Sequence, residues 1–145
     1  MKLLVLTIFT SLFLTNVQAH NEDKPGPNGG FIRMPGAFHT EVVPEKAGAF
    51  RLYLLDVNIE NPLATGPAPK AELVIGKQKT AFNCLVQKEN YFECTPTTKV
   101  SLAKGQLHLT VQREKLSGEA QYQLPLSLDG NSMSMGTQKE HPHSK

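Results

Sequence analysis

Residues 80–95 read TAFNCLVQKENYFECT, and this stretch decides the fold class. Apolar residues alternate with polar ones on both sides of a polar centre, and within each half they share one phase: Phe82, Cys84 and Val86, then Phe92 and Cys94. This period of two predicts a pair of β-strands. With residues 88–90 as a three-residue hairpin loop and Asn90 in the left-handed conformation, Cys84 falls opposite Cys94 and Val86 opposite Phe92.

The two cysteines of the chain predict a structural disulfide between Cys84 and Cys94. The N-terminal segment described below indicates export to an oxidising compartment, where a disulfide is the default for a cysteine pair. A redox-active or metal-binding pair is the alternative. The spacing disfavours it, because it lacks the C-x-x-C geometry of such sites.

The same period of two continues on both sides of the hairpin. Further strands are expected near residues 39–43, 50–54, 71–75, 106–113 and 122–128. After Leu54 the apolar phase slips by one residue, which predicts a bulge or a move to a second sheet. Pro125 cannot donate a ladder hydrogen bond, so the last strand is expected at an edge. Seven or so short strands joined by turns predict an all-β fold, an immunoglobulin-like antiparallel β-sandwich.

The N-terminus has the features of a secretory signal peptide. Lys2 precedes the apolar run Leu3–Leu14, and Val17-Gln18-Ala19 fits the small-residue rule for cleavage. The run is too short to span a bilayer, which takes about 20 residues. An uncleaved interfacial helix is the alternative, but the run has no polar face. We therefore expect residues 1–19 to be removed, leaving a periplasmic or secreted protein with no membrane span.

The expected mature chain has three parts. A flexible arm, residues 20–27, precedes the β-sandwich domain, residues 28–128. Residues 129–145 form a tail without apolar periodicity, which is expected to be disordered. Residues 1–19 hold one lysine and no acid, so 14 basic and 13 acidic residues remain after processing. This near-balance argues against nucleic acid as a partner.

Motifs of enzymes are not found in the sequence. The chain has no G-x-S-x-G, no H-E-x-x-H and no glycine-rich loop between a strand and a helix. We therefore expect a protein that is not an enzyme, and the side chains that can carry chemistry are its histidines and methionines.

Four of the five histidines lie outside the inferred core or at its margin: His20, His39, His141 and His143. Imidazole suits copper and zinc, and thioether sulfur selects Cu(I). His20 would begin the mature chain, where its α-amine and ring nitrogen can chelate one ion. The tail combines His141 and His143 with Met133 and Met135, which predicts a flexible secondary site. His108 is most simply an outward strand residue, and His39 also fits an ordinary surface residue.

One segment resembles a known family. Gly26-Pro27-Asn28-Gly29-Gly30, a short strand, and Gly36-Ala37-Phe38-His39-Thr40-Glu41-Val42-Val43 resemble the pattern G-P-H-G-G…G-x-(Y/F)-H-x-E-(L/V)-V. This pattern opens a family of small exported β-sandwich domains, found alone or attached to periplasmic adaptors of heavy-metal efflux systems. The resemblance is close over residues 26–43 and looser up to about Leu128. It implies roles for His39 and Glu41, whereas Asn28 replaces the first histidine of the family.

These observations predict an exported accessory protein that buffers or hands on copper, with zinc as the second choice. The expected metal site joins the His20 amine and imidazole to His39, with Glu41 or Met34 as weaker candidates. A periplasmic efflux adaptor or another envelope protein is the expected partner. The alternative is a non-enzymatic protein-binding or scaffold module of the cell envelope, in which the edge strand near residues 122–128 binds a partner and the histidines are incidental.

Overall fold

The computed structural model describes residues 24–88 and 90–127. These residues form eight strands and one short 3-10 turn: β1 (Phe31–Arg33), β2 (His39–Pro44), η1 (Lys46–Gly48), β3 (Phe50–Leu55), β4 (Lys70–Ile75), β5 (Gln78–Gln87), β6 (Tyr91–Pro96), β7 (Gly105–Arg113) and β8 (Leu116–Leu124). The expected boundaries after residues 19 and 128 lie outside the described residues. Within the described ranges, no helix has the length and apolar character needed to cross a bilayer.

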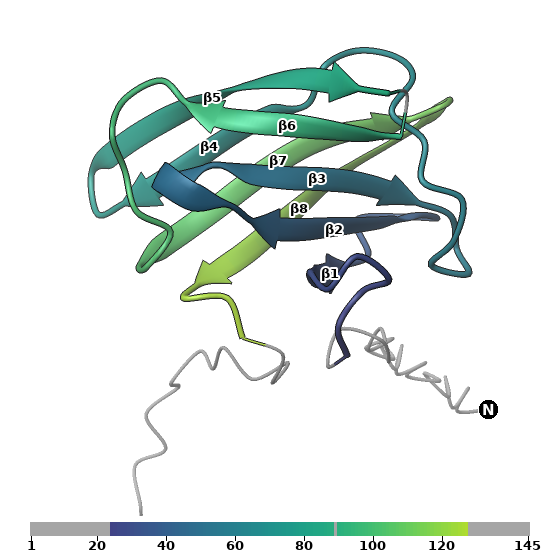
Figure 1. The fold of residues 1–145 in the computed structure, drawn as a ribbon, viewed down its shortest axis with the longest axis horizontal. Coiled ribbons are helices and arrows are strands. Elements are labelled where there is room, and N and C mark those ends of the chain that lie inside the picture. Colours follow the sequence, from purple (N-terminus) through teal and green to yellow (C-terminus); the bar gives the residue numbers. More distant parts are fainter. Residues whose placement is uncertain (1–23, 89, 128–145) are drawn as a thin grey trace, which may run out of the picture.

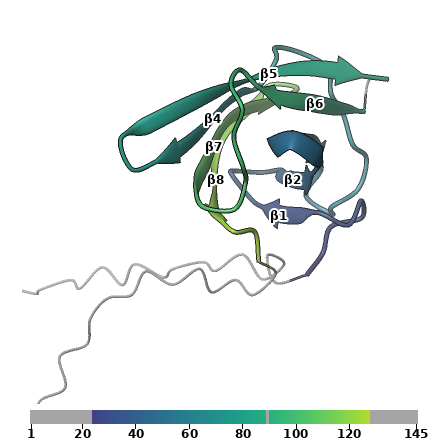
Figure 2. The same ribbon diagram turned by 60° about the vertical axis from the view of Figure 1, so that its left-hand side comes forward.

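All eight strands belong to one antiparallel sheet, with the order β1-β2-β3-β6-β5-β4-β7-β8. The sheet curls around a single interior until its edge strands β1 and β8 approach each other, so the molecule is nearly a closed barrel (Figure 1, Figure 2). The predicted all-β antiparallel fold is confirmed. The layers that pack together are two halves of this one curled sheet, and β8 is an edge strand as Pro125 predicted.

The interior of the barrel holds the main hydrophobic core. Every strand from β2 to β8 contributes alternate side chains to it. The largest fully buried members are Tyr122, Phe38, Phe50, Phe92, Leu52, Leu54, Leu73, Leu107 and Leu109. Removing this apolar surface from water is the main force that closes the sheet on itself.

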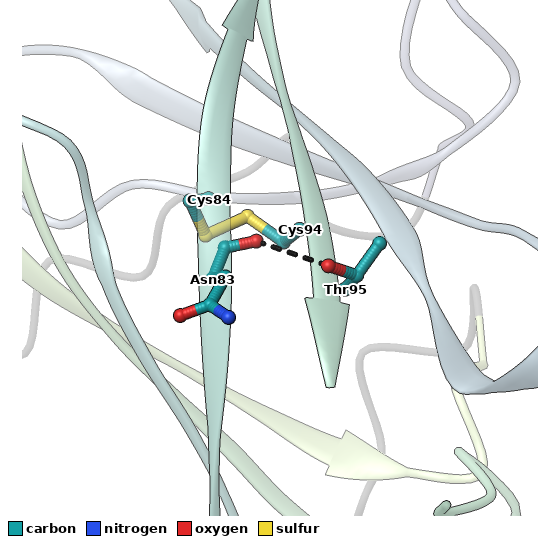
Figure 3. The surroundings of a disulfide bond; sticks show 4 residues. All are labelled: Asn83, Cys84, Cys94 and Thr95. Atoms are coloured by element: carbon teal, nitrogen blue, oxygen red, sulfur yellow. Dashed lines mark hydrogen bonds between the residues drawn. A yellow bond between two sulfur atoms is a disulfide. The ribbon is translucent and has the colours of Figure 1, made fainter. Parts of the chain in front are cut away.

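The β5–β6 hairpin has the predicted register. Cys84 pairs with Cys94 and Val86 with Phe92, and the last pair before the loop is Gln87 with Tyr91. The Cys84–Cys94 disulfide is confirmed, and beside it the Thr95 hydroxyl donates to the carbonyl of Asn83 at 3.5 Å (Figure 3). Within the loop, Lys88 has a left-handed φ of 48°.

The predicted bulge or sheet change after Leu54 is wrong. The β2–β3 pairing runs without interruption from Phe50 to Leu55, and a turn begins at Asp56. The apolar phase slips because β3 is buried on both faces. Leu54 faces the main core, whereas Tyr53 and Leu55 lie in a second cluster on the outer face.

The alternating strand directions place the connections at two opposite ends of the barrel, right and left in Figure 1. One end, called the His39 end below, carries the connections 34–38, 56–69, 88–90 and 114–115. The other, called the Lys46 end, carries the connections 45–49, 76–77 and 97–104.

Candidate functional site

The outer face of β2 buries two ionisable side chains outside the barrel core. His39 is 4% exposed and Glu41 is fully buried, although both point away from the main core that Val42 helps to form. Strand β2 is therefore covered on both faces. The segment 26–30 and the turn that begins at Asp56 contact this outer face.

The Glu41 carboxylate holds the turn of residues 26–30 against the sheet. Its Oε1 accepts hydrogen bonds from the backbone N–H groups of Asn28 and Gly30, both at 2.9 Å. Its Oε2 accepts a third from the Asn28 side-chain Nδ2 at 2.8 Å. Three donors satisfy most of the acceptor capacity of a buried carboxylate and offset the cost of burying its charge.

The glycines of this turn are needed for the close approach. A Cβ atom on Gly26 would overlap the Glu41 carboxylate, and one on Gly30 would overlap the backbone oxygen of Val42. Gly29 has a φ of 77°, which disfavours other residues. The motif that carries the family resemblance thus builds a turn around one carboxylate. Asn28 donates to that carboxylate, at the position where the pattern G-P-H-G-G has a histidine.

The His39 ring is held by the backbone of the turn that follows β3. Its Nδ1 lies 2.9 Å from the carbonyl oxygen of Asp56. Because a carbonyl only accepts, Nδ1 carries the hydrogen, and Nε2 of the neutral ring has a free lone pair. Among the described residues, Nε2 has no hydrogen-bond partner. Metal-binding histidines are commonly oriented in this way, by donation of the second ring N–H to a carbonyl.

The Asp56 turn is itself well ordered by hydrogen bonds. The Asp56 carboxylate accepts from Asn61 Nδ2 at 2.6 Å and from the backbone N–H groups of Asn58 and Glu60 at 2.9 and 3.0 Å. The bond from Asn61, followed by the one from the Glu60 N–H, lowers the pKa of Asp56 below its ordinary value. Arg113 donates to the Asn61 carbonyl at 3.0 Å. The carbonyl that orients His39 therefore has a fixed position.

The other predicted site residues are placed differently. Met34 is exposed in the β1–β2 connection, at the His39 end. The predicted primary ligand His20 and the predicted secondary site of Met133, Met135, His141 and His143 lie outside the described residues. Residues 24–88 and 90–127 contain no group of three or more His, Cys, Asp or Glu side chains placed to hold a metal ion.

The sequence analysis treated Glu41 as a weaker candidate for the metal site and missed that its carboxylate holds the turn of residues 26–30. The signal was present, because a glycine-rich turn and an acidic residue belong to the same motif.

His108 lies on the outside of β7, where Nε2 is 3.3 Å from Gln106 Oε1 and Nδ1 is 3.4 Å from Gln121 Nε2. Both of its ring nitrogens are thus engaged, unlike those of His39.

The chain matches no family model, and neither a curated protein nor a solved structure matches it.

Proposed function

We propose that this chain is an exported metal-binding accessory protein that buffers or transfers copper, with zinc as the second choice. The observation that carries the proposal is the orientation of His39. Its Nδ1 is held by the Asp56 carbonyl, so Nε2 is left with a lone pair for a metal ion. A single pre-oriented imidazole is a partial site, which needs ligands from elsewhere in the chain.

The turn at residues 26–30 supports His20 as the second source of ligands. Gly26 lies against Glu41, which is two residues from His39 on the same strand face, a separation of about 7 Å. Six residues lead from His20 to Gly26 and reach about 20 Å when extended. His20 is therefore within reach of His39. A site completed by such an arm suits exchange of the ion rather than permanent storage, because closing it costs ordering entropy.

Titration of the processed protein with Cu(II) and Zn(II) tests the proposal. His39→Ala should weaken Cu(II) binding at least about tenfold, the loss expected for one ligand or its orienting contact. One extra residue before His20, which removes the terminal chelate, should weaken it as well. His108→Ala is the matched control and should leave the affinity unchanged. If neither change at His20 or His39 alters copper affinity, the site is wrong. If the processed protein binds neither metal at micromolar concentration, the function is wrong.

A scaffold module of the cell envelope is the second candidate function, and one observation favours it. Most exposed large hydrophobic side chains among the described residues lie at or near the His39 end of the barrel, with Leu85 further along the outside of β5: Met34, Val57, Leu85, Val86 and Leu116. The edge of β8 is a poorer partner surface, because strand β1 approaches it. Metal-free protein that retains one stoichiometric envelope partner, lost on Leu85→Gln but not on His39→Ala, would favour this function over metal binding.

A further inference from the structure

We propose that the Lys46 end of the barrel docks onto an anionic membrane surface. Four exposed lysines lie on its connections: Lys46, Lys77, Lys99 and Lys104. Within the described part of the chain, none of the four side chains has a hydrogen bond or an ion pair. Their charges are therefore available to a partner.

The acidic residue in these connections is already neutralised. Glu45 is the only acid in segments 45–49, 76–77 and 97–104, and its Oε1 lies 2.6 Å from Arg51 Nε. The N–H is not aimed at that oxygen, so the contact is an ion pair rather than a directed hydrogen bond. With Glu45 paired to Arg51 of β3, the four lysines outnumber the one other carboxylate that lines a pocket with them, that of Glu93, so the Lys46 end keeps a net positive charge.

The connections that carry the lysines lie next to one another. A Cβ atom on Gly48 would overlap the carbonyl of Val100, and one on Gly105 would overlap the carbonyl of Val74. The β2–β3 connection therefore touches the β6–β7 connection, which in turn leads into β7 beside the end of β4 (Figure 1). The lysines thus share one end of the molecule instead of being scattered over it.

An open surface pocket lies between the β2–β3 and β6–β7 connections. It has a volume of about 570 Å³, and Lys46, Lys99 and Thr98 are among its lining residues. Glu93 also lines it, on the strand next to Arg51. Lys46 and Lys99 thus line one pocket on the surface, together with the carboxylate of Glu93.

The distribution of the four lysines favours a surface over a small anion. They come from three connections spread across the end of the barrel, so one phosphate cannot contact them all. A leaflet rich in anionic lipid can attract every lysine at once, at about 1 kcal/mol for each. The His39 end would then face away from the membrane. This proposal does not depend on metal binding.

Binding to lipid vesicles tests it. The full chain is mixed with phosphatidylcholine vesicles and with vesicles rich in phosphatidylglycerol, and the bound fraction is measured by flotation at low and high salt. Substituting Lys46, Lys77 and Lys99 by Gln should lower partitioning into the anionic vesicles about a hundredfold, since 1 kcal/mol per lysine is about fivefold. High salt should also lower partitioning into the anionic vesicles, because it screens the lysine charges. The apolar run Leu3–Leu14 is common to all variants and would bind neutral vesicles equally.

The matched control is a second triple variant, which loses the same number of positive charges near the His39 end. It replaces three exposed lysines near the His39 end by Gln: Lys70, Lys88 and Lys115. This control should bind anionic vesicles nearly as well as the unaltered chain. Equal losses in the two triple variants would overturn the proposal, because net charge alone would then explain binding. So would an absence of binding to anionic vesicles at low salt, whether or not the protein binds soluble polyphosphate.

Discussion

Tyr122 Oη lies 2.7 Å from Thr40 Oγ1 and donates to the Thr40 carbonyl at 3.0 Å. The two residues are 82 positions apart, on β8 and β2, and both are fully buried. The guanidinium of Arg33 in β1 lies over the Tyr122 ring, 5.2 Å from its centroid. Within the described strands, β1 and β8 share no backbone ladder, so these side chains hold the seam of the barrel together.

Tyr122→Phe should destabilise the protein by about 1–3 kcal/mol, because it leaves buried polar groups of Thr40 without their partner. The ring remains in place, so the loss is not one of packing. Urea unfolding at neutral pH measures it. Tyr91→Phe is the control, since Tyr91 is half-exposed and should cost less than about 0.5 kcal/mol. Equal effects of the two changes would contradict the role given to the Tyr122 hydroxyl.

Glu41→Leu should cost at least about 2 kcal/mol, because it removes the acceptor of three hydrogen bonds and leaves the backbone N–H groups of Asn28 and Gly30 without their partner. The backbone amides of Asn28 and Gly30 should also lose protection from hydrogen exchange. Glu119→Gln removes an exposed carboxylate on β8 and should change neither quantity. Unchanged exchange at Asn28 and Gly30 in the Glu41 variant would show that the carboxylate does not hold the turn.

The Asp56 turn should lose stability in acid. The folded-state pKa of Asp56 is lowered by the Asn61 hydrogen bond, then by the Glu60 N–H. A lowered folded pKa means that this contribution is fully present above the unfolded value, about 3.9, and is lost as the pH falls through the folded value. The free energy of unfolding should therefore decrease less steeply in the Asp56→Asn variant than in the unaltered chain as the pH is lowered from 5. Urea unfolding at several pH values measures this decrease. A slope identical to that of the unaltered chain would contradict this.

Replacing both Cys84 and Cys94 by Ala should lower the free energy of unfolding by about 2–3 kcal/mol on the chain-entropy account of a short closed loop. The unaltered chain should show a similar loss when unfolded in the presence of reductant. The double variant should not respond to reductant. A response of the variant equal to that of the unaltered chain would mean that the disulfide is not the origin of the effect.

The hairpin could be predicted from the sequence because all its determinants are local. Loop length and apolar phase together leave one register that places Cys84 opposite Cys94. Strands β2 and β3 are harder to predict. Alternation identifies a strand only when one face is exposed to solvent, and here both faces are covered. Burial on both faces produced the change of apolar phase at Leu55, and β3 ends at that residue without a bulge.

The candidate site was predictable as a list of residues but not as an arrangement. Glu41 meets its donors across 11 to 13 positions of sequence, and His39 meets the Asp56 carbonyl across 17. Every residue has a backbone carbonyl, so the residue type at position 56 does not reveal that its carbonyl contacts His39. For that reason the pattern could nominate His39 as a ligand, but the atom that orients its ring came only from the fold.

The seam between β1 and β8 also bears on how this protein avoids self-association. Strand β8 has nine residues, and an uncovered edge of that length is a template for pairing with other chains. Here strand β1 approaches β8 and covers part of that edge, and Pro35, just after β1, packs on the face of β8 at Gly118. Substitutions that separate β1 from β8 would thus expose the edge of β8 to pairing with other chains before they unfold the core. Their first visible consequence would be aggregation, at temperatures where the barrel is still folded.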